Sequence, residues 1–159
     1  MSNLNGETSN NSRVNGFDTV KVLDTMLAND HFSKWLGIVV DEYRIGYCRL
    51  HYTVKEEMMN GFGIIHGGAL FSASDSAFAF ACNSQGRLSV ALDVTISFIK
   101  SAKIGDILTV EAKEIHTGNS TSFYNVTTTN EKNEIISLFK GTAYRTGKMV
   151  YEPGNGANY

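Results

Sequence analysis

The fold of this chain is decided by the stretch from residue 60 to residue 86, which reads NGFGIIHGGALFSASDSAFAFACNSQG. Within it, residues 69–82 are almost entirely Ala, Leu, Phe and Ser, so they predict a helix that is buried on nearly every face. One acid, Asp75, lies inside this apolar helix. Ionisable side chains are rarely buried unless they are paired or have a chemical task, so Asp75 is the first candidate functional residue.

The residues just before this helix supply backbone N–H groups at its N-terminus. They are His66, Gly67 and Gly68, at the end of the helix where the dipole favours negative charge. An oxyanion-binding N–H group and a carboxylate so close in sequence favour acyl-transfer chemistry. The alternative is that the glycines only permit a tight turn and that Asp75 only bonds a neighbouring serine or a buried water.

The composition of the chain limits which kind of protein it can be. With 159 residues, 42% of them hydrophobic and 19% charged, the chain fits a single globular domain. A net charge of -2 without a long basic run argues against binding to duplex nucleic acid. No apolar run reaches membrane-spanning length, and no signal peptide is evident, so we expect a cytoplasmic protein. Cys48 and Cys82 lack CxxC spacing and predict free thiols, and the four histidines show no metal-ligand spacing.

The chain divides into three parts. Residues 1–17, rich in Asn, Ser and Gly, predict a disordered tail; residues 18–147 form the domain; and residues 148–159 predict a flexible C-terminal tail. Asp18 or Thr19 can cap a first helix, and Asn29 or Asp30 can cap a short second one that ends at Gly37.

Strand patterns surround the central helix. Residues 38–55 predict a strand bent at Gly46, and residues 92–98, 107–115, 121–129 and 134–145 predict four further strands. A helix that is apolar all round needs cover on every side, and a curved antiparallel sheet wrapped around it covers most of them. The remaining side requires a partner subunit.

These features resemble a known family. A helix wrapped by antiparallel strands is the α+β hotdog fold, and the motifs at the loop and helix resemble those of the phenylacetate-pathway (PaaI-type) hotdog thioesterases. The resemblance rests on Asn60-Gly61, His66-Gly67-Gly68 and residues 75–86. It continues through Phe98, Gly105-Asp106 and residues 138–141, and upstream through Asn29-Asp30 and residues 36–38. It covers roughly residues 20–147.

The resemblance implies hydrolysis of acyl-coenzyme A to the free acid and coenzyme A, and the expected acyl part is an aryl-acetyl group such as (hydroxy)phenylacetyl. It assigns Asp75 as nucleophile or general base and the N–H group of Gly67 as the donor to the thioester carbonyl, with His66 and Asn29 in support. The candidate substrate contacts are Asn60, Gly68, Phe71 and Lys100. No metal or separate cofactor is implied, and the family assembles as homodimers or homotetramers with sites between subunits.

Several of these assignments have a plainer alternative. Asn60 can hold the loop through a side chain–backbone bond, His66 can simply bond the loop rather than orient substrate, and Asn29 can be only a helix cap. Phe71 can be a core residue, and Lys100 can be a solvated surface charge. The chain also departs from the family at Lys100-Ser101, where Arg-Pro is usual; lysine keeps the charge without the two-pronged geometry of arginine. Ser74, directly before the acid, replaces a residue that is usually small and apolar.

The spacing of Gly67 and Asp75 bears on assembly. Eight helical residues separate them by roughly 10–12 Å, so one subunit cannot easily bring both groups to the same carbonyl. Two antiparallel helices across a dimer axis can, and the spacing therefore predicts an obligate dimer with two shared sites.

Two functions stay open, and so does the chemical route. The chain is an acyl-coenzyme A thioesterase, or it is a non-catalytic acyl-coenzyme A-binding sensor; the lack of an attached helix-turn-helix weakens the second reading. A hotdog dehydratase would use a histidine and an acid, but the surrounding motif resembles the thioesterases instead. Within the thioesterase reading, Asp75 either activates a water or attacks the thioester to form an anhydride.

Overall fold

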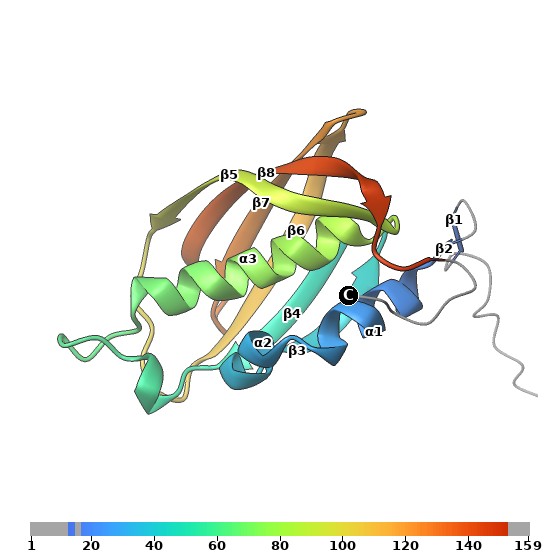
Figure 1. The fold of residues 1–159 in the computed structure, drawn as a ribbon. Helices are drawn as coiled ribbons and strands as arrows, with labels where there is room; N and C mark the ends of the chain where they lie inside the picture. The colour runs from blue at the N-terminus through green and yellow to red at the C-terminus, as the bar shows by residue number, and fades with distance from the viewer. Residues whose placement is uncertain (1–12, 15–16, 153–159) are drawn as a thin grey trace, which may run out of the picture.

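One curved antiparallel sheet wraps around a long helix in the computed structural model, which describes residues 13–14 and 17–152 (Figure 1). The helix, α3, spans Gly67–Asn83, and the sheet has six strands in the order β3-β4-β6-β7-β8-β5. In chain order the strands are β3 (Val39–Arg44), β4 (Tyr47–Thr53), β5 (Arg87–Phe98), β6 (Ile107–Thr117), β7 (Thr121–Thr129) and β8 (Ile135–Met149). This is the α+β hotdog fold that the sequence predicts.

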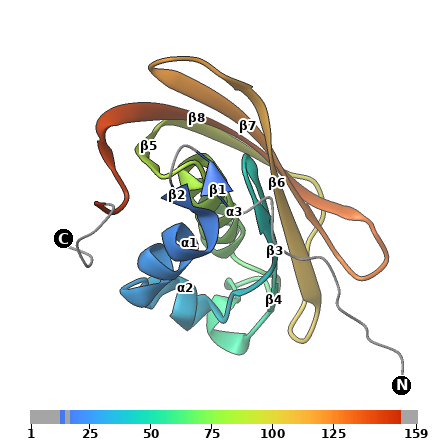
Figure 2. The ribbon, with the colours of Figure 1, turned by 90° about the vertical axis from the view of Figure 1, so that its right-hand side faces the viewer.

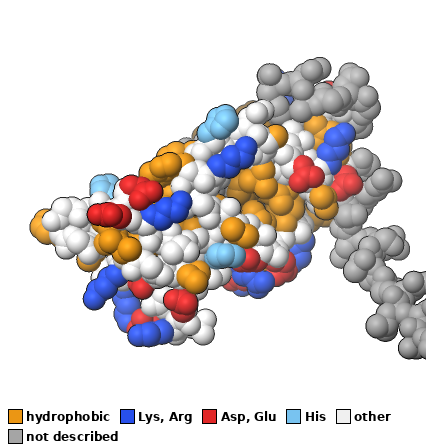
Figure 3. Space-filling view, turned by 90° about the horizontal axis from the view of Figure 1, so that it is seen from below, with side chains coloured by type: hydrophobic (Ala, Val, Ile, Leu, Met, Phe, Trp, Pro, Cys, Tyr) orange, Lys and Arg blue, Asp and Glu red, His pale blue; other side chains and the backbone are white. Residues whose placement is uncertain are grey.

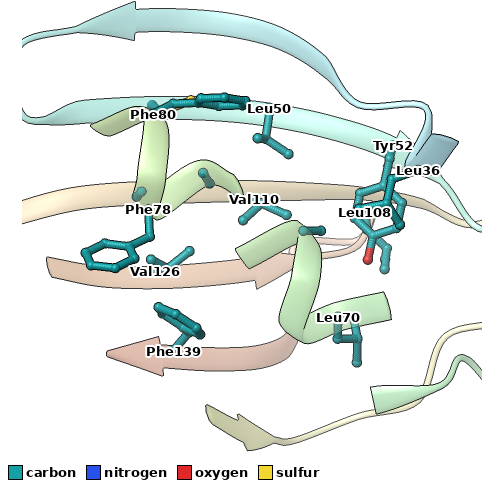
Figure 4. Close-up of a cluster of buried hydrophobic side chains, with 14 of the residues drawn as sticks. Leu36, Leu50, Tyr52, Leu70, Phe78, Phe80, Leu108, Val110, Val126 and Phe139 are labelled. Carbon is teal, nitrogen blue, oxygen red and sulfur yellow. The ribbon is translucent and has the colours of Figure 1, made fainter. Parts of the chain in front are cut away.

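The core lies between α3 and the concave face of the sheet. Phe78 and Phe80 of α3 are each 1% exposed, and they lie among side chains from four strands of the sheet (Figure 4), including Leu50, Val110, Val126 and Phe139. Full burial of a side chain of this size stabilises the fold by roughly 1.5–3 kcal/mol. The predicted burial of α3 therefore holds on its sheet-facing sides. A stripe on its other side stays half-buried and consists of Ser72, Asp75, Ser76 and Ala79.

Two short helices lie over that stripe. α1 spans Thr19–Ala28, and α2 spans His31–Leu36 (Figures 1 and 2). Figure 3 shows the molecule from below, where hydrophobic side chains gather near the middle of the face. The Asp18 carboxylate accepts a hydrogen bond from the N–H of Val20, and the Asp30 carboxylate accepts one from the N–H of Ser33. Of the two candidates that the sequence offers for each cap, the structure therefore selects Asp18 and Asp30. A one-turn 3-10 helix, η1 (Glu56–Met58), precedes the loop that leads to α3.

The prediction of one bent strand over residues 38–55 is wrong. The chain reverses at residues 45–46 and forms a β3–β4 hairpin, in which Arg44 pairs with Tyr47. Gly46 has a φ of 68°, a left-handed conformation that glycine adopts without steric cost. An alternating pattern that is interrupted by one glycine fits either a bend or a reversal, so the sequence alone did not separate them.

Both ends of the chain contribute ordered structure. β1 (Arg13–Val14) pairs with β2 (Phe17–Asp18), inside the stretch predicted to be a disordered tail, of which residues 1–12 and 15–16 lie outside the described part. At the other end β8 runs through Met149, and Val150 and Tyr151 are 2% and 6% exposed. The ordered domain therefore extends past residue 147, while residues 153–159 lie outside the described part.

Both cysteines are buried free thiols, as the sequence predicts. Burial raises the pKa of Cys48 and of Cys82 to about 12, so both stay protonated and unreactive at neutral pH. Within residues 13–14 and 17–152, no helix is long and apolar enough to span a membrane.

Candidate active site

Asp75 lies on the half-buried stripe of α3, and its carboxylate has no partner among the residues that the structure describes. The neighbouring serines are both bonded elsewhere: the Ser72 hydroxyl donates to the carbonyl of Gly68 (2.8 Å), and Ser76 Oγ lies 3.0 Å from Ser33 Oγ. Among the described residues no hydrogen bond or ion pair reaches Asp75, so the structure gives no support to a purely structural role for it. Burial raises the pKa of Asp75 above its ordinary value because water is partly excluded from the charged form.

The carboxylate faces a cavity of about 510 Å³. Asn29 and Asp30 lie on the wall opposite α3, at the junction of α1 and α2. Because Asp30 caps α2, the side chain of Asn29 has no capping task. The structure thus brings Asn29 and Asp75 to one cavity, as the family resemblance implies. The residues that line this cavity are Thr25, Met26, Asn29, Asp30, Phe32, Asp75, Ser76, Ala79, Phe80, Asn83, Leu88 and Val150.

At the start of α3, two of the first three N–H groups have acceptors. The N–H of Gly68 donates to Nδ1 of His66 (2.8 Å), and the N–H of Ala69 donates to the carbonyl of His66 (2.9 Å). His66 Nδ1 is therefore an acceptor, which places the proton of a neutral ring on Nε2. Within the described part of the chain no acceptor faces the N–H of Gly67, so this first donor of the helix is available to a ligand.

Gly67 and Asp75 do not share a cavity. Gly67 lines a second cavity of about 400 Å³ together with Asn60, Phe98 and Lys100. His66 and Gly68 line a third cavity, of about 360 Å³, at the surface of α2. One chain therefore presents the candidate oxyanion donor and the candidate base in separate places, in agreement with the eight-residue spacing.

The remaining candidates have identifiable contacts. The Asn60 side chain accepts from the N–H of Phe62 (2.9 Å) and from that of Ile64 (3.4 Å), so it holds the loop before α3. Phe71 packs edge-on against Phe139 with ring centroids 5.8 Å apart, a core contact beside α3. Lys100 is exposed and forms an ion pair of 2.7 Å with Glu134 at the rim of the Gly67 cavity. Ser74 is buried, and its hydroxyl donates to the carbonyl of Leu70.

Comparison with known proteins decides the family. The Thioesterase superfamily model matches residues 62–137. A putative esterase from Archaeoglobus fulgidus is 40% identical over 128 residues, which are 80% of this chain and 83% of the relative. Acyl-coenzyme A thioesterase PaaI from Escherichia coli is 40% identical over 125 residues, which are 79% and 89%. The chain belongs to the PaaI-type hotdog thioesterases.

Solved structures agree with this assignment. The structure of E. coli PaaI matches with a TM-score of 0.81 at 37% identity, covering 82% of this chain and 95% of that one. A hypothetical thioesterase from Streptococcus pneumoniae, solved with coenzyme A, matches with a TM-score of 0.68 at 27% identity, covering 70% and 88%. This thioesterase thus keeps the family fold, with α3 at its centre.

The sequence did not indicate the wall of the Asp75 cavity. Met26, Leu88 and Val150 line it, and they come from α1, from β5 and from the position directly after β8. No spacing rule joins residues so far apart, and the sequence placed Val150 in the predicted C-terminal tail. Among the described residues, no group of three or more His, Cys, Asp or Glu side chains could hold a metal ion.

Proposed function

We propose that this thioesterase hydrolyses acyl-coenzyme A, with (hydroxy)phenylacetyl or related aryl groups as the acyl part. The observation that carries the proposal is the half-buried Asp75 carboxylate, which has no partner within residues 13–14 and 17–152 and faces a cavity of about 510 Å³. The E. coli relative is named an acyl-coenzyme A thioesterase, and the S. pneumoniae structure holds coenzyme A. Both support the choice of thioester, and no further cofactor is required.

Asp75 acts as the general base in this proposal. Its carboxylate takes a proton from a water, whose oxygen bonds to the thioester carbon while the carbonyl oxygen becomes an oxyanion. The free N–H of Gly67 stabilises that oxyanion, and collapse of the intermediate breaks the C–S bond and releases the coenzyme A thiolate. The raised pKa of Asp75 makes it a stronger base than an exposed aspartate. In the alternative route Asp75 itself attacks the carbon, forms an anhydride and expels the thiolate before water enters.

The catalytic unit in this proposal is a homodimer, since one chain keeps Gly67 and Asp75 in different cavities. β5 is an edge strand of the sheet, and it exposes Val90, Leu92 and Phe98 at 49%, 62% and 55%. A long apolar edge strand is a liability unless another chain covers it. Pairing of two β5 edges sets two α3 helices antiparallel, so that Gly67 of one subunit approaches Asp75 of the other. A homotetramer then forms from two such dimers.

Other residues support the substrate. Asn29 of one subunit and His66 of the other flank the reacting group, and Gly68 follows His66 at the start of α3. Phe71, on the same helix, contributes apolar surface to the acyl site. Lys100 supplies a positive charge for a coenzyme A phosphate at the rim of the Gly67 cavity. Asn60 holds the loop that carries His66. The two free thiols fit a reducing cytoplasm.

Thiol release from a panel of aromatic and aliphatic acyl-coenzyme A thioesters tests the proposal. Wild type is compared with Asp75→Asn, and Asp24→Asn, which removes an exposed carboxylate of α1, is the matched control. We expect aromatic preference in wild type and in the control, and a loss of about 10²–10⁴-fold in Asp75→Asn. Near wild-type turnover by Asp75→Asn would refute the role of the acid. Tight binding without release from any thioester would favour the sensor function.

A further inference from the structure

The Asp75 cavity is an elongated channel between α1 and α3. On α3 its lining runs from Asp75 to Asn83, eight residues or about 12 Å along the helix axis. α1 runs the opposite way, because Asn29 at its end shares the cavity with Asp75, while Val22 near its start packs against Val150. The carboxylate therefore lies at one end of the channel, and Val150 lies toward the other.

The far end of the channel is closed by the last described residues of the chain. We name residues 149–151 the C-terminal strap. The N–H of Val150 donates to the carbonyl of Gly86 (2.8 Å), which ties the strap to the turn after α3. The Val150 side chain is 2% exposed and lines the channel, as does Leu88 at the start of β5.

The strap is anchored on the start of α1. The Tyr151 hydroxyl accepts a hydrogen bond from the N–H of Asp18 (2.9 Å), and its ring packs edge-on against Phe17 with centroids 5.5 Å apart. Lys21 Nζ lies 4.5 Å from the centroid of the same ring. Gly86, with a φ of 82°, gives Phe17 its space, because a Cβ there would lie 2.5 Å from the ring. The start of α1 and the turn at Gly86 thus hold the strap in place.

The closed end of the channel is apolar. Met26, Phe80, Leu88 and Val150 line it, and its one amide, Asn83, has its hydrogen bonds already made. Asn83 Nδ2 donates to the carbonyls of Ala79 and Ser89, and Oδ1 accepts from the N–H of Ser89. The Thr25 hydroxyl on the α1 side of the lining donates to the carbonyl of Lys21 (2.7 Å). Among the described residues no charged side chain lines this end, so the lining suits an apolar acyl terminus.

We propose that the C-terminal strap is the specificity determinant of this thioesterase: Val150 forms the stop against which the end of the acyl group rests. The inference depends on the proposed function, since it takes the channel beside Asp75 as the acyl site. A channel of about 12 Å is longer than one aromatic ring, so it accommodates phenylacetyl and medium-length aliphatic groups and excludes longer ones at the strap. A smaller residue at position 150 lengthens the channel, and a larger one shortens it.

The test compares Val150→Ala and Val150→Phe with wild type. Val20→Ala is the matched control, because Val20 is 57% exposed on the outer side of α1. The readouts are kcat/KM for acetyl-, phenylacetyl-, hexanoyl- and decanoyl-coenzyme A, and Kd for the corresponding non-hydrolysable thioethers. We expect Val150→Ala to raise the decanoyl-to-hexanoyl ratio about tenfold and Val150→Phe to lower it about tenfold, because each methylene in an apolar pocket is worth 10-fold or more. Acetyl-coenzyme A should be unaffected.

Leu88→Ala provides a second probe that leaves the strap intact, should a Val150 variant fail to fold. It should shift the same ratio in the direction of Val150→Ala. Ratios equal to wild type in all folded variants would overturn the proposal. The thioether Kd values keep this test separate from the proposed function. An absence of thiol release from wild type would refute the proposed hydrolysis. Unchanged Kd ratios among the variants would refute the role of the strap in specificity.

Discussion

Ser76 Oγ lies 3.0 Å from Ser33 Oγ, so a hydrogen bond joins α2 to α3 one residue after Asp75. Ser33 is 2% exposed, and its N–H donates to the Asp30 carboxylate that caps α2. The pair of hydroxyls therefore connects the cap of α2, and Asn29 beside it, to the helical turn that carries Asp75. This contact holds α2 against the turn of α3 that carries Asp75.

Removal of either hydroxyl should loosen this connection. We expect Ser33→Ala and Ser76→Ala each to lower the free energy of unfolding by about 1 kcal/mol, and the double variant to lose less than the sum, since the two share one bond. Urea unfolding of the three variants measures the coupling. Ser72→Ala is the control, because that hydroxyl bonds only its own helix. Strictly additive losses would contradict a direct link.

The sequence predicted the elements whose signals are local. The structure confirms α3, β7 and the caps of α1 and α2. The sequence signal of each of these features comes from residues within a few positions of it. It did not predict the β3–β4 reversal, because Gly46 alone carries that signal. It also did not predict that Val150 and Tyr151 are ordered, since their burial depends on Phe17 and Val22, more than a hundred residues away along the chain.

The role of Asp75 as a base predicts that activity falls at acidic pH. Asp75 acts as a base only when it is ionised, and burial raises its pKa above the aspartate value of about 3.9. The kcat/KM of wild type should therefore fall as pH drops, with a midpoint above about pH 4. Rate measurements between mildly acidic and neutral pH locate this midpoint, and the residual activity of Asp75→Asn should lack it. If the variant showed the same fall in rate at acidic pH, the titrating group would be one other than Asp75.

The same pKa shift links Asp75 to stability. Because the folded pKa exceeds the unfolded one, the folded state binds the proton more tightly, and stability falls as pH rises through the interval between the two values. At pH 7 the ionised carboxylate destabilises the fold, so Asp75→Asn should melt at a higher temperature than wild type. The higher melting temperature of Asp75→Asn should vanish below about pH 4, where Asp75 is protonated in both the folded and the unfolded state. Thermal melts at the two pH values check the sign, and a lower melting temperature at pH 7 would refute it.

Substitution of Lys100 tests whether the coenzyme A phosphates bind at the rim of the Gly67 cavity. Its ion pair with Glu134 is exposed, so its loss should leave the melting temperature nearly unchanged. If Lys100 binds a phosphate, Lys100→Met should raise KM for acyl-coenzyme A severalfold but not for the matching acyl-pantetheine, which lacks those phosphates. Glu134→Gln, which keeps the lysine charge, is the control and should not raise KM. An equal rise in KM for both thioesters would indicate a general change in the site.

Substitution of Gly67 by alanine tests the position of the proposed oxyanion donor, because it keeps the N–H group but crowds its neighbour. A Cβ on this residue would lie 2.9 Å from the ring of Phe98, while its N–H would be retained. Phe98 is 55% exposed and can move, so Gly67→Ala should fold, yet a displacement of the loop of about 1 Å is enough to lower kcat/KM by up to about 10²-fold. Gly147→Ala is the control, because no atom lies within 4 Å of a Cβ built there. Addition of Phe98→Ala to Gly67→Ala removes the collision and should recover activity while the N–H is still present. Failure of the double variant to recover, with Phe98→Ala alone active, would show that position 67 needs more than its N–H and its space.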